Sequence, residues 1–210
     1  MECSVGDNIV ATVYVYEANG GTDGTPGTKT RVDGQGANDG TDVRYATTDA
    51  YNPVATYPCV IPSSGFYYSY WKHHYLNISG TFTQVDNIRW YTDGAIGWTL
   101  GTGGVLNVGV RDAGDNGCPM DTEYDVATGT QGTTGHGIED VVDGHGYYNS
   151  QTTKVADASG YTSGSPLTVD TTVYTGADDS DAVVSQIKID DDATQGTQTD
   201  ETLTFMYDEI

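Results

Sequence analysis

The sequence predicts an all-β protein: an antiparallel two-sheet sandwich, jelly-roll-like or immunoglobulin-like, with long loops rich in Gly, Thr and Asp. Short runs of β-branched and aromatic residues recur along the chain, and Gly, Asp and Thr separate them. No long window places apolar residues at the helical spacing i, i+3, i+4 and i+7. Roughly nine or ten such strands suffice for two packed sheets, and we expect residues 1–210 to form a single domain.

In the N-terminal part, a first strand is expected at Asn8–Tyr16, where β-branched and aromatic residues dominate. Thr22–Gly40 is rich in Gly, Thr and Asp, and predicts a long loop. Two short strands are expected at Asp42–Thr47 and Val54–Ile61, and prolines in and beside the second place it near a sheet edge.

The strongest strand signal is the aromatic block Phe66–Gly94, which ends in the turn dipeptide Asp93-Gly94. A further strand pair, Ala95–Leu100 and Val105–Val110, is expected to extend this block into an antiparallel meander.

Residues 111–152 are poor in apolar side chains and predict a loop-rich excursion on the surface or an insertion. Strands are then expected at Leu167–Tyr174, Ala182–Ile189 and Glu201–Tyr207. In Ala182–Ile189 the alternation predicts one face with Val184, Gln186 and Lys188, and a second face with Val183, Ser185, Ile187 and Ile189.

The chain has 30 acidic against 8 basic residues, a net charge of −22. This charge repels nucleic acids and anionic membranes, so we expect neither as a partner. It fits a protein adapted to a saline medium. Met1–Asp7 has neither the basic nor the apolar part of a signal peptide. This predicts synthesis and folding in the cytosol for a complete chain, or a removed signal for a mature form. Cys3, Cys59 and Cys118 leave open either one Cys59–Cys118 disulfide or three free thiols.

Three groups of residues are candidate metal ligands, each weighed against an ordinary solvated turn. Acidic clusters on either side of one predicted strand would bind Ca²⁺ if the fold brings them together; they comprise Asp178, Asp179, Asp181, Asp190 and Asp192. A partial match to a calcium loop comprises Asp112, Asn116 and Glu123. His136 and His145, in a Gly-rich segment with carboxylates, would suit zinc or another transition metal. No cofactor is required by these patterns, and calcium is the ion that most of them would take.

No catalytic constellation is recognisable, which predicts a protein that is not an enzyme. The adjacent aromatic residues cannot all face inward on alternating strands. We therefore expect some of them at a subunit contact or, second, at a carbohydrate-stacking surface. The candidates are Tyr68, Tyr70, Trp71, Tyr75, Trp90 and Trp98.

The segments 70–80 (YWKHHYLNISG) and 85–94 (VDNIRWYTDG), with the C-terminal strands at 186–209, resemble β-sandwich virion structural proteins of tailed phages and archaeal tailed viruses. The resemblance implies a non-catalytic capsid decoration or tail component, made in the host cytoplasm, that assembles as a homo-oligomer or with other virion proteins. The alternative is a secreted or cell-surface filament subunit, adhesin or carbohydrate-binding module. A hydrolase ranks third.

Overall fold

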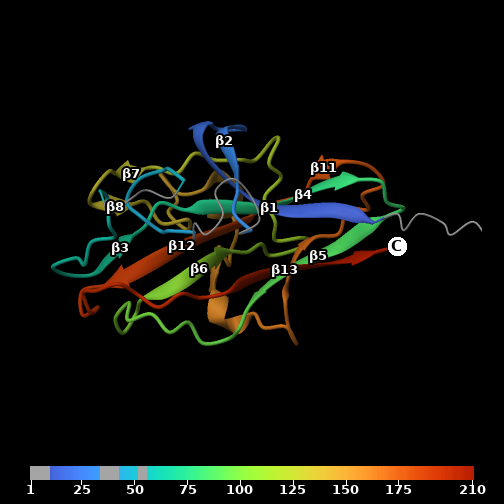
Figure 1. The fold of residues 1–210 in the computed structure, drawn as a ribbon. Coiled ribbons are helices and arrows are strands. Elements are labelled where there is room, and N and C mark those ends of the chain that lie inside the picture. The colour runs from blue at the N-terminus through green and yellow to red at the C-terminus, as the bar shows by residue number, and fades with distance from the viewer. Residues whose placement is uncertain (1–9, 34–42, 52–55) are drawn as a thin grey trace, which may run out of the picture.

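The computed structural model describes residues 10–33, 43–51 and 56–210, and it confirms the all-β, antiparallel prediction. The described strands form an eight-stranded sheet in the order β2-β1-β4-β12-β6-β9, a three-stranded sheet in the order β10-β5-β13, and a hairpin of β7 and β8. In the large sheet, β11 also pairs with β4, and β3 pairs with β12. Figure 1 shows β5 and β13 running beside β1 and β4 toward the end of the molecule that carries the C-terminus.

The elements have the following bounds: β1 Ala11–Thr22, β2 Thr25–Arg31, β3 Phe66–Tyr68, β4 Lys72–Gly80, β5 Val85–Thr92, β6 Val105–Gly109, β7 Gly129–Thr130, β8 Thr134–Gly135, α1 Gly146–Asn149, β9 Val155–Asp157, the 3-10 helix Ala158–Gly160, β10 Leu167–Asp170, β11 Asp178–Asp179, β12 Val183–Asp190 and β13 Leu203–Glu209. Among the described residues, no helix has the length and the apolar character needed to cross a membrane.

The prediction of a loop from Thr22 onward is wrong for its described part, because β1 turns directly into β2. The turn is Asp23-Gly24, with Gly24 at φ +73°, and Thr22 pairs with Thr25 across it. Asp-Gly is a preferred turn dipeptide of β-hairpins, and the β-branched threonines of β2 favour strand geometry. The turn dipeptide, and not the low hydrophobicity, therefore determines that this segment forms a hairpin.

Three other expected strands are not formed in their described parts. Residues 43–47, 56–61 and 96–100 run without ladder pairing. Single backbone hydrogen bonds fix them instead, for example from Thr47 to the carbonyl of Tyr57 (3.0 Å) and from Asp190 to the carbonyl of Leu100 (2.8 Å). Residues 8 and 9 of the first predicted strand, residue 42 of the second, and residues 54 and 55 of the third lie outside the described residues.

The main core lies between the two sheets. Leu76 and Ile78 of β4, Leu106 and Val108 of β6, and Trp90 of β5 are all buried there. In β12, Val183, Ile187 and Ile189 face this core, while Val184 packs on the opposite side, which confirms the predicted alternation. Because side chains alternate along a strand, every second side chain of β4 and β12 points to the opposite face of the large sheet, away from this core.

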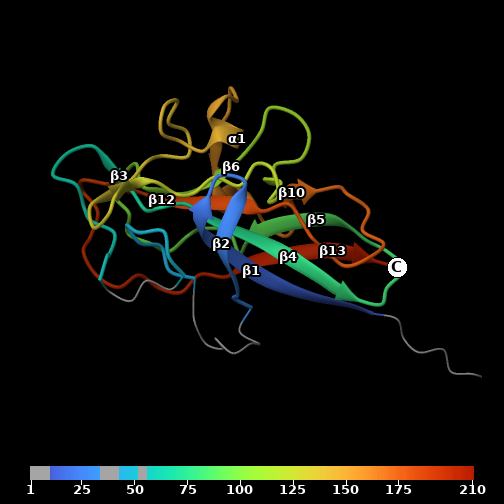
Figure 2. The same ribbon diagram turned by 90° about the horizontal axis from the view of Figure 1, so that it is seen from above.

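Residues 111–152 cover that opposite face and do not form a surface excursion. Cys118, Ile138 and Tyr148 are fully buried against Trp71 and Val184 of the large sheet. A neighbouring cluster packs Met120 and Tyr124 on Tyr75, Ala18 and Ala182. Figure 2 shows α1 and the loops beside it on one side of β6 and β12. The large sheet is therefore covered on both faces, by the small sheet and by this loop-rich layer.

Burial on both faces of the large sheet overturns the prediction of an exposed aromatic surface for four of the six candidates. Tyr70, Trp71, Tyr75 and Trp90 are at most 8% exposed. Tyr68 and Trp98 are partly buried, and Trp98 packs edge-on against Tyr45 with ring centroids 6.0 Å apart. Successive aromatic residues of the block face opposite sides, as expected, but each side is an interior.

Candidate metal centre

A side-chain cluster between the large sheet and the loop-rich layer brings together His73, Cys118 and His145. His73 lies on the face of β4 that points away from the main core. Cys118 is fixed by a two-way backbone bridge with Ala182, in which both N–H···O distances are 2.8 Å. His145 is the N-cap residue of α1. Each potential ligand is therefore positioned by backbone structure of its own.

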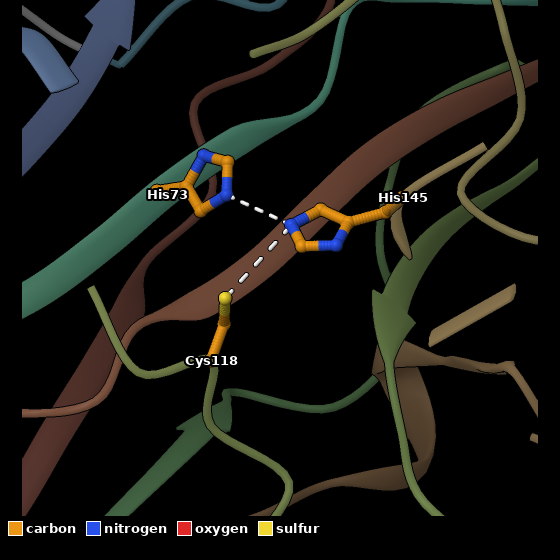
Figure 3. A group of neighbouring side chains, drawn as sticks. All are labelled: His73, Cys118 and His145. Carbon is orange, nitrogen blue, oxygen red and sulfur yellow. Dashed lines mark hydrogen bonds between the residues drawn. The ribbon is translucent and has the colours of Figure 1, made fainter. Parts of the chain in front are cut away.

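The three donor atoms converge on one point (Figure 3). The Nε2 atoms of His73 and His145 are 3.0 Å apart, and Sγ of Cys118 lies 3.9 Å from Nε2 of His145. All three donor atoms lie within 4.8 Å of one another. A tetrahedral zinc ion would separate such ligand atoms by roughly 3.3–3.6 Å. To bind one ion, the two His145 distances would each have to change by a few tenths of an ångström. The donor atoms of His73 and Cys118, which lie within 4.8 Å of each other, would have to come to a similar separation.

The cluster is buried, and its groups are uncharged. All three residues are at most 1% exposed. Burial lowers the pKa of His145 to about 3 and lowers the pKa of His73 well below its usual value. Burial, together with the nearby carboxylates of Asp181 and Glu123, raises the pKa of the Cys118 thiol well above its usual value. The imidazoles are thus in the neutral form that binds metal, and a metal ion would have to displace the thiol proton.

The hydrogen bonds of the cluster define its proton positions. Nδ1 of His145 accepts a hydrogen bond from the backbone N–H of Tyr147 at 3.3 Å, which places the ring proton on Nε2. Nε2–H then donates to Nε2 of His73. The thiol of Cys118 donates to the carbonyl oxygen of Glu123 at 3.1 Å. Metal binding through Nε2 of His145 would move that ring proton to Nδ1, which lies 3.9 Å from the carboxylate of Asp125. Nδ1 would then no longer accept the N–H of Tyr147, so metal binding would break that capping hydrogen bond.

Aromatic rings enclose the cluster. The ring centroids of Trp71 and Tyr148 lie 5.6 and 5.0 Å from that of His145, and the Tyr124 ring lies 4.5 Å from that of His73. Such a wall excludes water and lowers the local dielectric, which strengthens the attraction between a cation and a thiolate. Two imidazoles and a thiolate form a donor set that suits Zn²⁺ and copper.

The two histidines that were predicted together do not meet. His145 is in the cluster, whereas Nδ1 of the partly buried His136 is hydrogen-bonded to Thr128 at 2.9 Å. The actual partners of His145 are 72 and 27 residues away along the chain. The sequence signals that could have found them were the outward position of His73 on a predicted strand and the presence of a cysteine in the same polar segment.

The acidic clusters expected to converge on calcium lie apart. Asp178 and Asp179 pair with β4, and Asp179 binds Lys29 at 2.8 Å. Asp190 and Asp192 lie at the far end of β12, whose eight residues span about 25 Å. The carboxylates of Asp190–Asp192 do lie within 4.8 Å of one another, but they accept hydrogen bonds from backbone N–H groups of neighbouring loops. Asp181 lies between β11 and β12, two residues after Asp179, and burial beside Asp170 and Asp115 raises its pKa to about 7.

The calcium-loop match is explained by turn structure. The carboxylate of Asp112 accepts hydrogen bonds from the N–H groups of Thr152 and Thr153, at 2.7 and 2.9 Å. The amide of Asn116 accepts from the N–H of Arg111 and donates to the carbonyl of Thr168. The backbone carbonyl of Glu123 accepts the hydrogen bond of the Cys118 thiol. Both carboxylate oxygens of Asp112 thus accept hydrogen bonds from backbone N–H groups.

The cysteines in the described part of the chain, Cys59 and Cys118, are free thiols. The predicted alternative of a disulfide between them is therefore wrong, and Cys3 lies outside the described residues. The chain was compared with protein-family models, with curated proteins and with solved structures, and none of them matches it. The centre is assigned from its geometry.

Proposed function

We propose that this chain is a non-catalytic structural protein whose fold is completed by one zinc ion, held by His73, Cys118 and His145. The observation that carries the proposal is the convergence of these three donor atoms from three separate segments at one fully buried point. The ion would link β4, the residue that bridges to β12, and the start of α1. It would thereby fasten the loop-rich layer to the large sheet.

The burial of the three side chains supports a structural role over a catalytic one. A catalytic zinc site keeps a coordination position that substrate or water can reach, whereas a structural site is closed. Here aromatic rings surround the ligands, and the carbonyl oxygen of Glu123 lies 3.1 Å from Sγ of Cys118. That carbonyl, or an internal water molecule, is the candidate for a fourth ligand.

Cobalt substitution tests this proposal with the full chain. Co²⁺ bound by two imidazoles and one thiolate is expected to give ligand-field bands together with a thiolate charge-transfer band, at one ion per chain. Cys118→Ser should remove the charge-transfer band, and His145→Gln should weaken binding at least tenfold. His136→Gln is the matched control, because His136 lies outside the cluster, and it should bind cobalt as the wild type does. A wild-type protein that takes up neither Zn²⁺ nor Co²⁺ would refute the proposal.

As a second function, we propose that the protein is a virion component of the capsid-decoration or tail type, which assembles with copies of itself or with other virion proteins. The resemblance of its aromatic block to such proteins supports this role. A structural observation also favours assembly: among the described strands, β13 pairs only with β5, so its other edge is open. Proline and charged side chains normally block pairing at an edge strand. Residues 203–207 (LTFMY) contain neither.

The open flank beside β13 is apolar. A groove of about 380 Å³ lies between β1 and β13 and includes Val13, Val15, Leu203 and Phe205 in its lining. An edge strand next to an apolar groove suits strand addition by another chain. The test is particle association: the protein should co-purify with particles or form oligomers. Met206→Lys, which places a charge on β13 at a side chain outside the main core, should abolish this. A wild-type protein that is strictly monomeric and absent from every particle fraction would refute the role.

The alternative role, a secreted or cell-surface filament subunit or adhesin, shares the same edge and predicts assembly without a particle. A carbohydrate-binding role is less favoured, because Trp71 and Trp90, which were expected to stack on sugars, are 2% and 1% exposed.

A further inference from the structure

A pocket on the surface adjoins the buried cluster. It has a volume of about 260 Å³, and its lining includes the carboxylic acids Asp23, Glu123 and Asp125 together with Gly146 and Tyr147 of α1. The pocket combines residues from the β1–β2 turn, from the loop-rich layer and from the helix that His145 caps. Three acidic residues around a concave surface attract cations and raise their local concentration.

One wall of this pocket is also a wall of the cluster. The three consecutive residues 123–125 each contact a different ligand side chain. The carbonyl of Glu123 accepts the Cys118 thiol at 3.1 Å, the Tyr124 ring lies 4.5 Å from the His73 ring, and the carboxylate of Asp125 lies 3.9 Å from Nδ1 of His145. A single segment one residue thick therefore separates the acidic pocket from all three donor groups.

We propose that this acidic pocket is the route by which a divalent metal ion reaches the buried centre, and that Asp125 is the outer partner that orients His145 once the ion is bound. This inference rests on the proposed zinc centre. The pocket supplies electrostatic capture, and the wall 123–125 must then move for the ion to pass.

Several hydrogen bonds hold the wall in place, and one of them joins it to the start of α1. Oδ2 of Asp125 accepts a hydrogen bond from the N–H of Gly146 at 2.5 Å, and this contact joins the wall to the start of α1. The carbonyl of Asp125 accepts from the indole N–H of Trp71 at 2.9 Å, and the hydroxyl of Tyr124 donates to the carbonyl of Gly20 at 2.8 Å. Tyr124 also accepts a backbone hydrogen bond from Gly24 (2.7 Å), and Glu123 donates one to Pro119 (2.9 Å). Opening on the Asp125–Gly146 side leaves these contacts intact, so we take this side as the one that opens. After opening, the released carboxylate is free to accept Nδ1–H of a metal-bound His145.

The experiment separates the rate of loading from the affinity at equilibrium. Metal-free full-length protein is mixed with Co²⁺ in a stopped-flow instrument, and the thiolate charge-transfer band is followed at low and at high salt. The double variant Asp23→Asn/Glu123→Gln removes two pocket charges but keeps the polar atoms of both side chains. It should load about tenfold more slowly than the wild type at low salt, with unchanged stoichiometry, and the difference should shrink at high salt. The control Asp200→Asn removes an exposed charge elsewhere and should load at the wild-type rate.

Asp125→Asn tests the orienting role. An asparagine can still accept the Gly146 hydrogen bond, but it presents no carboxylate to Nδ1 of His145. The expected result is a 10- to 100-fold weaker affinity for Co²⁺ at equilibrium, with the charge-transfer band retained. If the double variant loads at the wild-type rate, the route is refuted while the zinc centre stands. An unchanged affinity in Asp125→Asn would refute the orienting role, and a wild-type protein that binds no ion would overturn the centre and the route together.

Discussion

The buried ion pair between Glu17 of β1 and Lys72 of β4 gives the sharpest test of the energetics of this fold. The carboxylate of Glu17 is 0% exposed; it accepts a hydrogen bond from Lys72 Nζ at 2.5 Å and lies 3.4 Å from Nε2 of His74. Glu17→Gln removes the negative charge and leaves the ammonium group of Lys72, whose side chain is 6% exposed, buried without its carboxylate partner. Lys72 also donates to the carbonyl of Ala50 at 3.4 Å, a neutral acceptor. Removing one partner of a buried pair costs about 3–5 kcal/mol.

The pKa of Glu17 gives a second route to the same magnitude. Burial by itself would raise this pKa, but Lys72 and His74 outweigh burial and lower it from 4.5 to about 2. A lowered carboxyl pKa means that the folded protein binds the proton more weakly than the unfolded chain. The stabilisation is therefore fully present above pH 4.5 and is lost as the pH falls toward 2. A shift of this size corresponds to roughly 3 kcal/mol.

The assay is the free energy of unfolding in urea, measured for both proteins from pH 7 to pH 3. At pH 7 we expect Glu17→Gln to be less stable by about 3–5 kcal/mol, or roughly 6–20 °C in Tm for a chain of this length. The difference should shrink at acid pH. The control Asp208→Asn breaks the exposed Arg89–Asp208 pair and should cost less than about 1 kcal/mol. If Glu17→Gln does not fold, the double variant Glu17→Leu/Lys72→Met should recover stability. A loss below about 1 kcal/mol at pH 7 would refute the reasoning.

Three further predictions concern the second cover of the large sheet and its surroundings. Zn²⁺ at about 1,000 times its Kd should stabilise the wild type by about 4 kcal/mol, seen as a rise in Tm of roughly 8–16 °C, and an equal rise in Cys118→Ser would contradict the centre. Gly109→Ala should lose about 1–3 kcal/mol in urea unfolding, because the new Cβ would lie 2.6 Å from the Tyr148 ring, whereas Gly176→Ala, with no atom within 4 Å, should be neutral. Burial raises the pKa of Asp181 to about 7, so this group's stabilisation is present below pH 3.8 and is lost as the pH rises through 7. Asp181→Asn should therefore match the wild type at pH 4 and exceed it at pH 8 in the same urea assay, and equal stability at pH 8 would count against the argument.

Strand alternation was the part of the fold that could be predicted residue by residue. The two faces of β12 follow from the period of two in Val183–Ile189, and β6 and β10 lie within the predicted runs. β13, Leu203–Glu209, overlaps the predicted run Glu201–Tyr207 but ends two residues beyond it. The β1–β2 hairpin was missed although its Asp23-Gly24 turn is visible in the sequence, because low hydrophobicity was given more weight than turn chemistry. The short segments at 43–47, 56–61 and 96–100 have strand-like composition, but they lack a neighbouring strand with which to form a ladder.

The candidate metal centre could be predicted only in fragments. His145 was identified, with His136 as a partner that does not reach it. His73 and Cys118 were present in the sequence, but their distance along the chain from His145 hides their proximity. The same limit applies to the aromatic block, where burial of Trp71 and Tyr75 depends on a cover formed by residues more than 40 positions later.

The sequence by itself determined that this is an antiparallel β protein with a strongly acidic surface, and it determined which residues share a face of each regular strand. These properties are local, because they depend on side-chain alternation, turn dipeptides and charge. Only the tertiary structure decided that segment 111–152 covers the outer face of the large sheet. This cover buries aromatic residues that were expected to be exposed, and it brings two histidines and a cysteine together in one cluster. The physical reason is that burial and ligand geometry arise from contacts between distant segments, which no local pattern records.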